Sequence, residues 1–165
     1  MPFQKNVEAP ALGIAGSPYG GNPRAYFLPT PLASAAVKVG GFVWADAATG
    51  KVKATGTGKP LGVAVRERDI PLPCDEEATL TIPAGLRVPV LVSGDVILVS
   101  TTAVTVGQAV FAVLADGTIK TDAAGGTVSG AIETDFIART AAAAGEPFVA
   151  STVNPLPAAS TPGQA

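Results

Sequence analysis

The segment of this 165-residue chain that comes nearest to a known reactive motif is a glycine-rich stretch ending in a lysine, Gly56-Thr57-Gly58-Lys59-Pro60. A phosphate-binding loop needs a glycine five positions before its Gly-Lys pair, and a serine or threonine after the lysine. Lys53 and Pro60 occupy those two positions. The sequence therefore predicts a turn between two strands here, and not a nucleotide site.

A second group of candidate residues surrounds the single cysteine, in Cys74-Asp75-Glu76-Glu77. Neighbouring carboxylates disfavour the thiolate that makes a cysteine reactive. Adjacent carboxylates without the spacing of a calcium loop are typical of a solvated loop. Glu133 and Asp135 alternate along one run, so they share a face, where an outward polar surface explains them without chemistry. The sequence predicts no metal and no cofactor.

The composition disfavours several classes of function. The chain has no histidine, which removes the commonest general base and the commonest metal ligand, and we predict that it is not an enzyme. The net charge of -2 and the scattered basic residues disfavour binding to nucleic acid. No stretch approaches the roughly 18 apolar residues of a membrane helix, so we predict no membrane partner. No signal-peptide pattern is visible at the N-terminus.

The elements that would position a site are organised around a stretch that occurs twice. Val37–Lys53 reads VKVGGFVWADAATGKVK, and Val104–Lys120 reads VTVGQAVFAVLADGTIK. Each copy has a β-branched run that ends in glycine, a short alternating strand, a small-residue turn and a return strand, which is typical of a hairpin. The sequence predicts two related hairpin halves, with Trp44 and Phe111 buried at corresponding positions. The same pattern occurs in biotinyl and lipoyl carrier domains, but Gly50 before Lys51 does not match their modified lysine.

Short apolar runs between Gly, Pro and Asp turns predict an all-β fold, a β-sandwich or barrel of jelly-roll-like type. The two dense runs on either side of Ser93-Gly94-Asp95 predict strands that are buried on both faces, by sheet and by partner or arm. Pro89 predicts that the first of these runs lies at a sheet edge. The only helical candidate is Thr140–Ala144, which is too short to stand alone. The expected strands are Val37–Ala45, Lys51–Thr55, Leu61–Arg68, Thr79–Ile82, Arg87–Val92, Val96–Val99, Gln108–Val113, Thr118–Thr121, Gly130–Arg139 and Pro147–Val153.

Residues 1–36 differ from the rest, because prolines and glycines exclude a long helix or a central strand. This segment nevertheless holds four of the nine aromatic residues, Phe3, Tyr19, Tyr26 and Phe27. It is an arm folded back over its own barrel, an extended arm whose aromatics dock on a partner, or a simply disordered segment. We predict an N-terminal arm at 1–36, a β domain at 37–153 and a C-terminal tail at 154–165. The four aromatics and Pro89 are the candidate partner-binding residues.

The order of several short motifs resembles that of the bacteriophage structural cement, or head-decoration, proteins. The resemblance runs from about residue 4 to about residue 153. It rests on Gln4-Lys5, the stretch Pro10–Gly16, Asn22-Pro23, the two copies of V-x-V-G-x-x-V at Val37–Val43 and Val104–Val110, and Leu61–Val65.

The resemblance implies a homo-oligomer, a dimer or trimer, that binds the outer surface of the assembled head and bridges neighbouring subunits of the major capsid protein. Such a protein is made in the host cytoplasm and ends in the virion. The alternative from another class is a carbohydrate- or cell-surface-binding β-sandwich, which should display a cluster of exposed aromatic side chains. Phe42, Trp44 and Phe111 lie within the repeats, where packing in the core is the simpler role.

Overall fold

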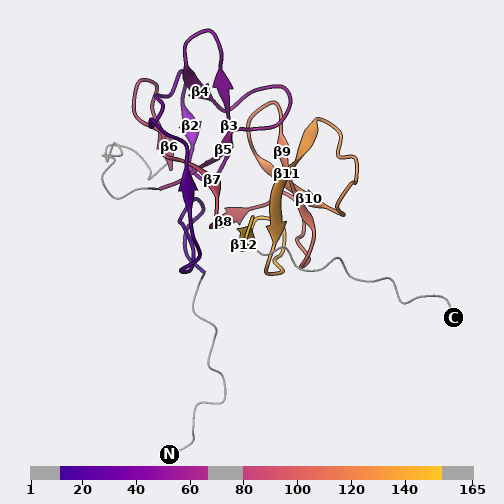
Figure 1. The fold of residues 1–165 in the computed structure, drawn as a ribbon. Helices are drawn as coiled ribbons and strands as arrows, with labels where there is room; N and C mark the ends of the chain where they lie inside the picture. Colours follow the sequence, from indigo (N-terminus) through magenta and orange to yellow (C-terminus); the bar gives the residue numbers. More distant parts are fainter. Residues whose placement is uncertain (1–11, 67–79, 154–165) are drawn as a thin grey trace, which may run out of the picture.

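The computed structural model describes residues 12–66 and 80–153, which form strands and turns (Figure 1). Two five-stranded antiparallel sheets lie next to each other, and a small third sheet pairs β2 with β6. The strands are β1 (Ala25–Tyr26), β2 (Val37–Lys38), β3 (Phe42–Asp46), β4 (Lys51–Lys53), β5 (Gly62–Ala64), β6 (Thr81–Ile82), β7 (Val90–Ser93), β8 (Asp95–Val99), β9 (Ala109–Val113), β10 (Ile119–Asp122), β11 (Ala131–Ala138) and β12 (Pro147–Ser151).

The chain completes the first sheet before it begins the second. The first sheet has the order β1-β7-β5-β3-β4, and the second has the order β8-β12-β11-β9-β10. Gly94, with a positive φ of 131°, separates β7 of the first sheet from β8 of the second. Figure 1 shows the result as an indigo-to-magenta half beside an orange half. The prediction of an all-β sandwich is confirmed.

The two halves are related in register as well as in sequence. In the first hairpin Trp44 pairs with Lys53, and in the second Phe111 pairs with Lys120. The turns also match, because the Gly50 amide donates to the Asp46 carbonyl at 2.8 Å and the Gly117 amide donates to the Val113 carbonyl at 2.9 Å. Both glycines have a positive φ, which a residue without a side chain adopts at little cost. The predicted hairpin halves are confirmed.

The main core lies between the two large sheets. Trp44 and Phe111 are 3% and 2% exposed, so both aromatic residues of the repeat are buried as predicted. Phe42 of the first half packs edge-on against Phe136 of the second, with ring centroids 5.8 Å apart. Because side chains alternate along a strand, Phe42 and Trp44 point into this core while Val43 between them points away from it.

A second, smaller core covers the other face of the first sheet. Val43, Val52 and Val90 of that sheet pack there with Ile82 of β6 and Ala33 of the N-terminal segment. The first sheet is therefore covered on both faces. This confirms the prediction that the dense apolar run before Ser93, which forms most of β7, is buried on both faces. The second cover comes from the chain's own N-terminal segment and from the β2–β6 sheet.

The described part of the arm, residues 12–36, runs along the sheet edges of its own domain. Gly16 donates to the Ile97 carbonyl at 2.8 Å, and the Ile97 amide donates to Ser17 at 3.0 Å. β1 then pairs with β7 at the edge of the first sheet. Farther on, the Val52 amide donates to Leu32 at 2.9 Å, which covers β4 at the opposite edge. Covering exposed edges in this way prevents unwanted strand pairing. Of the three alternatives for the arm, these residues follow the folded-back one.

Two local predictions from the sequence are wrong. β7 is not an edge strand, because β1 lies on one side of it and β5 on the other. Pro89 precedes the strand, so its missing amide costs the ladder nothing, and its carbonyl accepts from Val65 at 2.9 Å. The helical candidate at Thr140–Ala144 is extended instead, since Ala142 pairs with Val104.

The matching turn glycines give a paired test of how the halves fit together. A Cβ on Gly117 would overlap the carbonyl oxygen of Phe42 in the other half, whereas a Cβ on Gly50 would meet nothing within 4 Å. Both positions have a positive φ, so alanine at either site should cost about 1–2 kcal/mol of unfolding free energy. We expect Gly117→Ala to cost clearly more than Gly50→Ala in urea denaturation. Equal losses would contradict the contact between the halves.

Candidate functional site

An exposed apolar groove lies where the arm passes the turn of the first hairpin. Phe27, Leu28 and Leu32 are 36%, 76% and 40% exposed. Phe27 and Leu32, together with residues 29–31 and the turn Thr49–Lys51, line a depression of about 430 Å³, which we call the arm groove. Leu28 is not part of this lining but stands between Phe27 and Pro29 in the sequence. A leucine that is three-quarters exposed adds apolar surface that a partner can cover. The groove is held in place because β1 and Leu32 are both tied to the first sheet.

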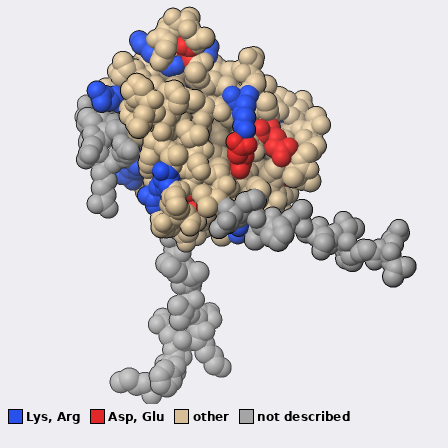
Figure 2. All heavy atoms as spheres, viewed as in Figure 1, with Lys and Arg blue, Asp and Glu red and all other residues tan. Residues whose placement is uncertain are grey.

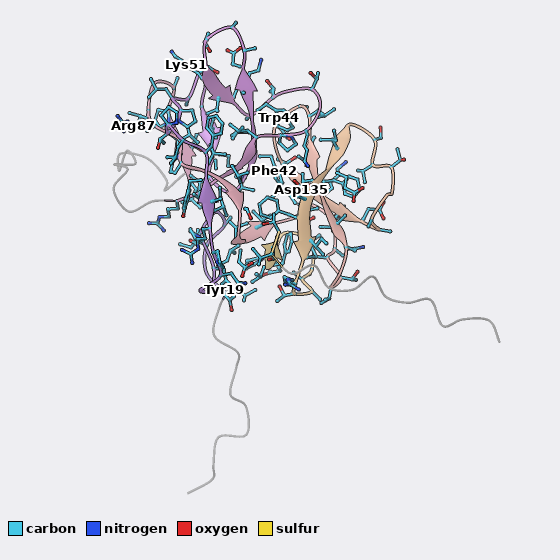
Figure 3. All side chains as sticks on the ribbon, viewed as in Figure 1. Tyr19, Phe42, Trp44, Lys51, Arg87 and Asp135 are labelled. Carbon is cyan, nitrogen blue, oxygen red and sulfur yellow. The ribbon has the colours of Figure 1, made fainter. Side chains whose placement is uncertain are left out.

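The rim of the arm groove is basic. Lys51 belongs to its lining, and Arg87 is the bridge partner of Leu32 (Figure 3). Asp46, the one acid of the first half among the described residues, is engaged in the turn, where Thr49 Oγ1 donates to its carboxylate at 2.8 Å. This hydrogen bond, helped by the Ala48 amide and by Lys53 and Lys51, holds the pKa of Asp46 below its usual value. An apolar groove with basic neighbours fits a partner that is both apolar and acidic.

A second exposed group lies at the other end of the first half. Figure 3 places Tyr19 far from Lys51, at the opposite end of the molecule. Tyr19 is 40% exposed, and Ile14 in the same stretch of the arm is 48% exposed. The Tyr19 amide donates to the Asp95 carbonyl at 3.0 Å, so this stretch is anchored on the second sheet. We call Ile14 and Tyr19 the Tyr19 end.

The candidate partner-binding residues do not form one site. Tyr19 and Phe27 are exposed at opposite ends of the first half, while Tyr26 is partly buried and packs against the main core. Pro89 is buried inside the chain and offers no surface to a partner. Phe3 lies outside the described residues. Leu28 and Leu32 were not among the candidates predicted from the sequence, which were the four aromatics of the arm and Pro89. Their place on either side of two prolines, in Phe27-Leu28-Pro29-Thr30-Pro31-Leu32, was the available signal.

The segments that suggested chemistry have structural roles where they are described. The stretch from Gly56 to Pro60 connects β4 to β5 as predicted, and the Gly58 carbonyl accepts from Trp44 Nε1 at 2.8 Å. Lys59 forms an ion pair with Asp135 at 2.6 Å, with both side chains largely exposed. Glu133 faces outward on the same strand and accepts from the Gly125 amide at 3.0 Å, which confirms the predicted polar face.

Asp95 is the one carboxylate of the described residues that is nearly buried. It is 8% exposed, and Asn22 Nδ2 donates to its Oδ2 at 2.6 Å. Its Oδ1 has no hydrogen-bond partner among the described residues. Asp95 begins β8 next to the crossing at Gly94, so the bond from Asn22 fixes the arm at the junction of the two sheets.

Two other features, a metal site and a membrane-spanning helix, are not found among the described residues. The described residues hold no group of three or more His, Cys, Asp or Glu side chains that could bind a metal ion. Within 12–66 and 80–153, no helix is long and apolar enough to span a membrane. The acidic stretch Cys74–Glu77 lies outside the described residues.

Comparisons with known proteins agree on one class, the structural proteins of phage capsids. Among solved structures, one from "The capsid of Myoviridae Phage XM1" has the same fold, with a TM-score of 0.66 at 17% identity; the alignment covers 94% of this chain and 100% of that one. A family model described as "XM1 gp53 minor capsid protein" matches residues 3–152. The chain therefore belongs to the XM1 gp53 minor capsid protein family. The comparison with curated proteins gives no match.

The family gives the functional class at a coarse level. The chain is a structural protein of a phage capsid, so it is a component of the virion and associates with other capsid proteins. The predicted relation to a capsid-associated phage family is confirmed.

Proposed function

We propose that this chain is a cement, or decoration, protein that binds the outer surface of the assembled head and bridges neighbouring subunits of the major capsid protein. The family match over residues 3–152 carries the proposal, because it makes the chain a minor component of a capsid. The order of motifs shared with head-decoration proteins supports the more specific role.

The surface of the described residues is compatible with this role. The arm covers edges of both large sheets, so contacts are left to exposed side chains and not to open strands. The Tyr19 end is the surface we assign to the capsid. Residues 1–11, which include Phe3, precede this surface in the sequence, and we assign them to the same partner. A tyrosine and a phenylalanine each bury about 150–250 Å² in an interface, so two of them supply a substantial part of the binding free energy.

The mechanism is stabilisation by preferential binding. A protein that binds the assembled shell, and not the separate subunits, shifts the equilibrium toward the shell. At a free concentration 100 times the Kd, each site contributes about 2.7 kcal/mol. Because one oligomer would hold several capsid subunits, moderate single contacts add up to strong attachment.

A sedimentation experiment tests the proposal directly. The full chain is mixed with purified heads that lack it and, separately, with unassembled major capsid protein. We expect it to sediment with the heads alone and to raise the temperature at which they disassemble. Equal binding to free subunits, or no change in head stability, would contradict the cement role.

The Tyr19 end gives a prediction at the level of residues. Tyr19→Ala, or removal of residues 1–11, should weaken attachment to heads about tenfold or more, since each removes aromatic contact area. The melting temperature of the isolated chain should change little. Tyr26→Ala is the contrasting variant, because Tyr26 packs against the core and its loss should lower stability. Full attachment by Tyr19→Ala and by the shortened chain would exclude this end as the capsid contact.

The alternative of a carbohydrate-binding sandwich gains no support from the aromatic residues. Phe42, Trp44 and Phe111 are buried in the core. Phe27 lines the same groove as Lys51, and Figure 3 places Tyr19 at the opposite end of the molecule from Lys51, so the two aromatic residues do not form a joint stacking platform.

A further inference from the structure

The two halves differ at one position where their sequences agree. Val39 and Val106 occupy the same place in the repeat, yet Val39 is 2% exposed and Val106 is 53% exposed. In the first half, the Val39 amide donates to the Leu80 carbonyl at 2.7 Å, and Ala15 and Gly16 of the arm lie against Gly40. In the second half, the space around Gly107 is open within the described residues. Val106 is thus an apolar residue at the tip of a turn, without the cover that its counterpart has.

The halves also differ in charge. The described part of the first half carries Arg24, Lys38, Lys51, Lys53, Lys59, Arg66 and Arg87 against the single acid Asp46. The second half carries Asp95, Asp116, Asp122, Glu133, Asp135 and Glu146 against Lys120 and Arg139. Figure 2 shows basic side chains along the top and left of the molecule, over the first half, and acidic ones over the second. One pair, Lys59 and Asp135, already joins the two halves within the chain.

Asp122 brings the acidic charge close to the exposed valine. It is the last residue of β10 and pairs with Ala109, the first residue of β9, three positions after Val106. Asp122 is exposed, and the turn that carries Val106 is closed by a bond from the Thr105 amide to Gln108 Oε1 at 2.9 Å. We call Val106 and Asp122 the Val106 surface. It is apolar and acidic, whereas the arm groove is apolar and basic.

We propose that copies of this chain associate head to tail, with the arm groove of one copy receiving the Val106 surface of the next. The contact covers Leu28 and Val106, and it sets Lys51 and Arg87 against Asp122. Contacts between unlike surfaces repeat around a rotation axis and close into a ring when the rotation allows. The inference rests on the self-association within the proposed function and assigns its two surfaces.

The choice of a second copy as the occupant follows from complementarity within one chain. Both surfaces combine exposed apolar side chains with charge of one sign, and the signs are opposite. Because the charges lie at the surface, the association should weaken as salt is raised, since the Debye length falls to about 8 Å at physiological ionic strength.

The test compares matched variants by sedimentation velocity in the absence of capsids. We expect an oligomer for the unchanged chain, and association at least about tenfold weaker for Val106→Lys and for Leu28→Glu. Each variant sets like charges against each other, a new lysine against Lys51 and Arg87 or a new glutamate against Asp122, and like charges in contact oppose association. Val92→Lys is the control for Val106→Lys, since Val92 is also an exposed valine, at 40%. Retained melting temperatures show that the variants are folded.

Charge reversal identifies the pairing. Lys51→Glu with Arg87→Glu should weaken association, and adding Asp122→Lys on the neighbouring copy should restore part of it. Lys59→Glu is the charge control on the same half, outside the arm groove. A monomeric unchanged chain, an oligomer insensitive to Val106→Lys, or absence of rescue would each overturn the proposal.

Two other occupants of the groove give different results. The first alternative is that the acidic stretch Asp75-Glu76-Glu77 of the same chain pairs with the groove. Replacing these three acids by alanines then strengthens self-association or leaves self-association unchanged. In that case Lys51→Glu also lowers the melting temperature of the single chain. If the groove faces the capsid, Leu28→Glu abolishes binding to heads and leaves the oligomer intact. Both results overturn the head-to-tail contact. Binding to heads is measured in a separate assay. If the unchanged chain is monomeric but still binds heads, the ring is refuted and the cement role is not.

Discussion

Removal of residues 1–36 is expected to abolish cooperative folding. The amides of Ile97, Val52 and Val88 donate to arm residues Ser17, Leu32 and Pro31 at 2.8–3.0 Å, so the truncation strips partners from both large sheets. It also deletes β1 and Ala33, which is fully buried in the smaller core. The combined loss should approach the whole stability of a domain, about 5–15 kcal/mol. Circular dichroism and urea denaturation measure it.

The shorter deletion of residues 1–11 is the matched control. Among the described residues, both core clusters and the residues packed against them lie between Tyr26 and Ala150, so this variant should unfold at close to the original urea concentration. The boundary between residues 36 and 37 predicted from the sequence implies the opposite result, a folded domain at 37–153. A cooperative transition of the longer truncation at full stability would support that boundary and make the arm contacts dispensable.

The hairpins could be predicted because their signals are local. Gly50 and Gly117 are needed for a positive φ at the same point of each turn, and the alternating residues before them fix which side chains enter the core. A one-residue slip in register would move Trp44 from the main core to the opposite face of its sheet, where the smaller valine now packs. The repeat in the sequence therefore predicted both the position and the register of the hairpin strands.

The arm could not be predicted in the same way, because its structure depends on distant partners. β1 has only two residues, and it exists because β7 offers an open edge. Pro89 predicted that the strand after it lies at a sheet edge. That prediction failed because β1 pairs with β7 and takes the edge position. The unequal burial of Val39 and Val106 was also hidden, because the sequence repeats while the surrounding elements do not.

The candidate site was predicted in part. The sequence placed candidate partner-binding residues in the arm, and Tyr19 and Phe27 of this set are exposed, while their binding to a partner stays a prediction. It did not show that these two lie at opposite ends, because their separation in space is set by how the arm crosses from the second sheet to the first. The charge difference between the halves is visible in the sequence once the halves are known.

Replacement of Trp44 by alanine is expected to cost about 3–5 kcal/mol of unfolding free energy, as large-to-small changes in a core do. Trp44 is 3% exposed, and its ring fills the space against Gly56 in the connection between β4 and β5. Phe111→Ala should cost a similar amount, because Phe111 occupies the same position of the second hairpin and is only 2% exposed. Chemical denaturation of the two variants measures both values.

A third variant separates packing from hydrogen bonding at this position. Trp44→Phe keeps most of the buried ring but removes the Nε1 donor from the Gly58 carbonyl, a bond of 2.8 Å. We expect it to cost less than Trp44→Ala but at least about 1 kcal/mol, since the acceptor is left without its partner. If Trp44→Ala and Phe111→Ala both retain the melting temperature of the unchanged chain, the hairpins do not carry the core. The two halves would then be similar in sequence without contributing equally to stability.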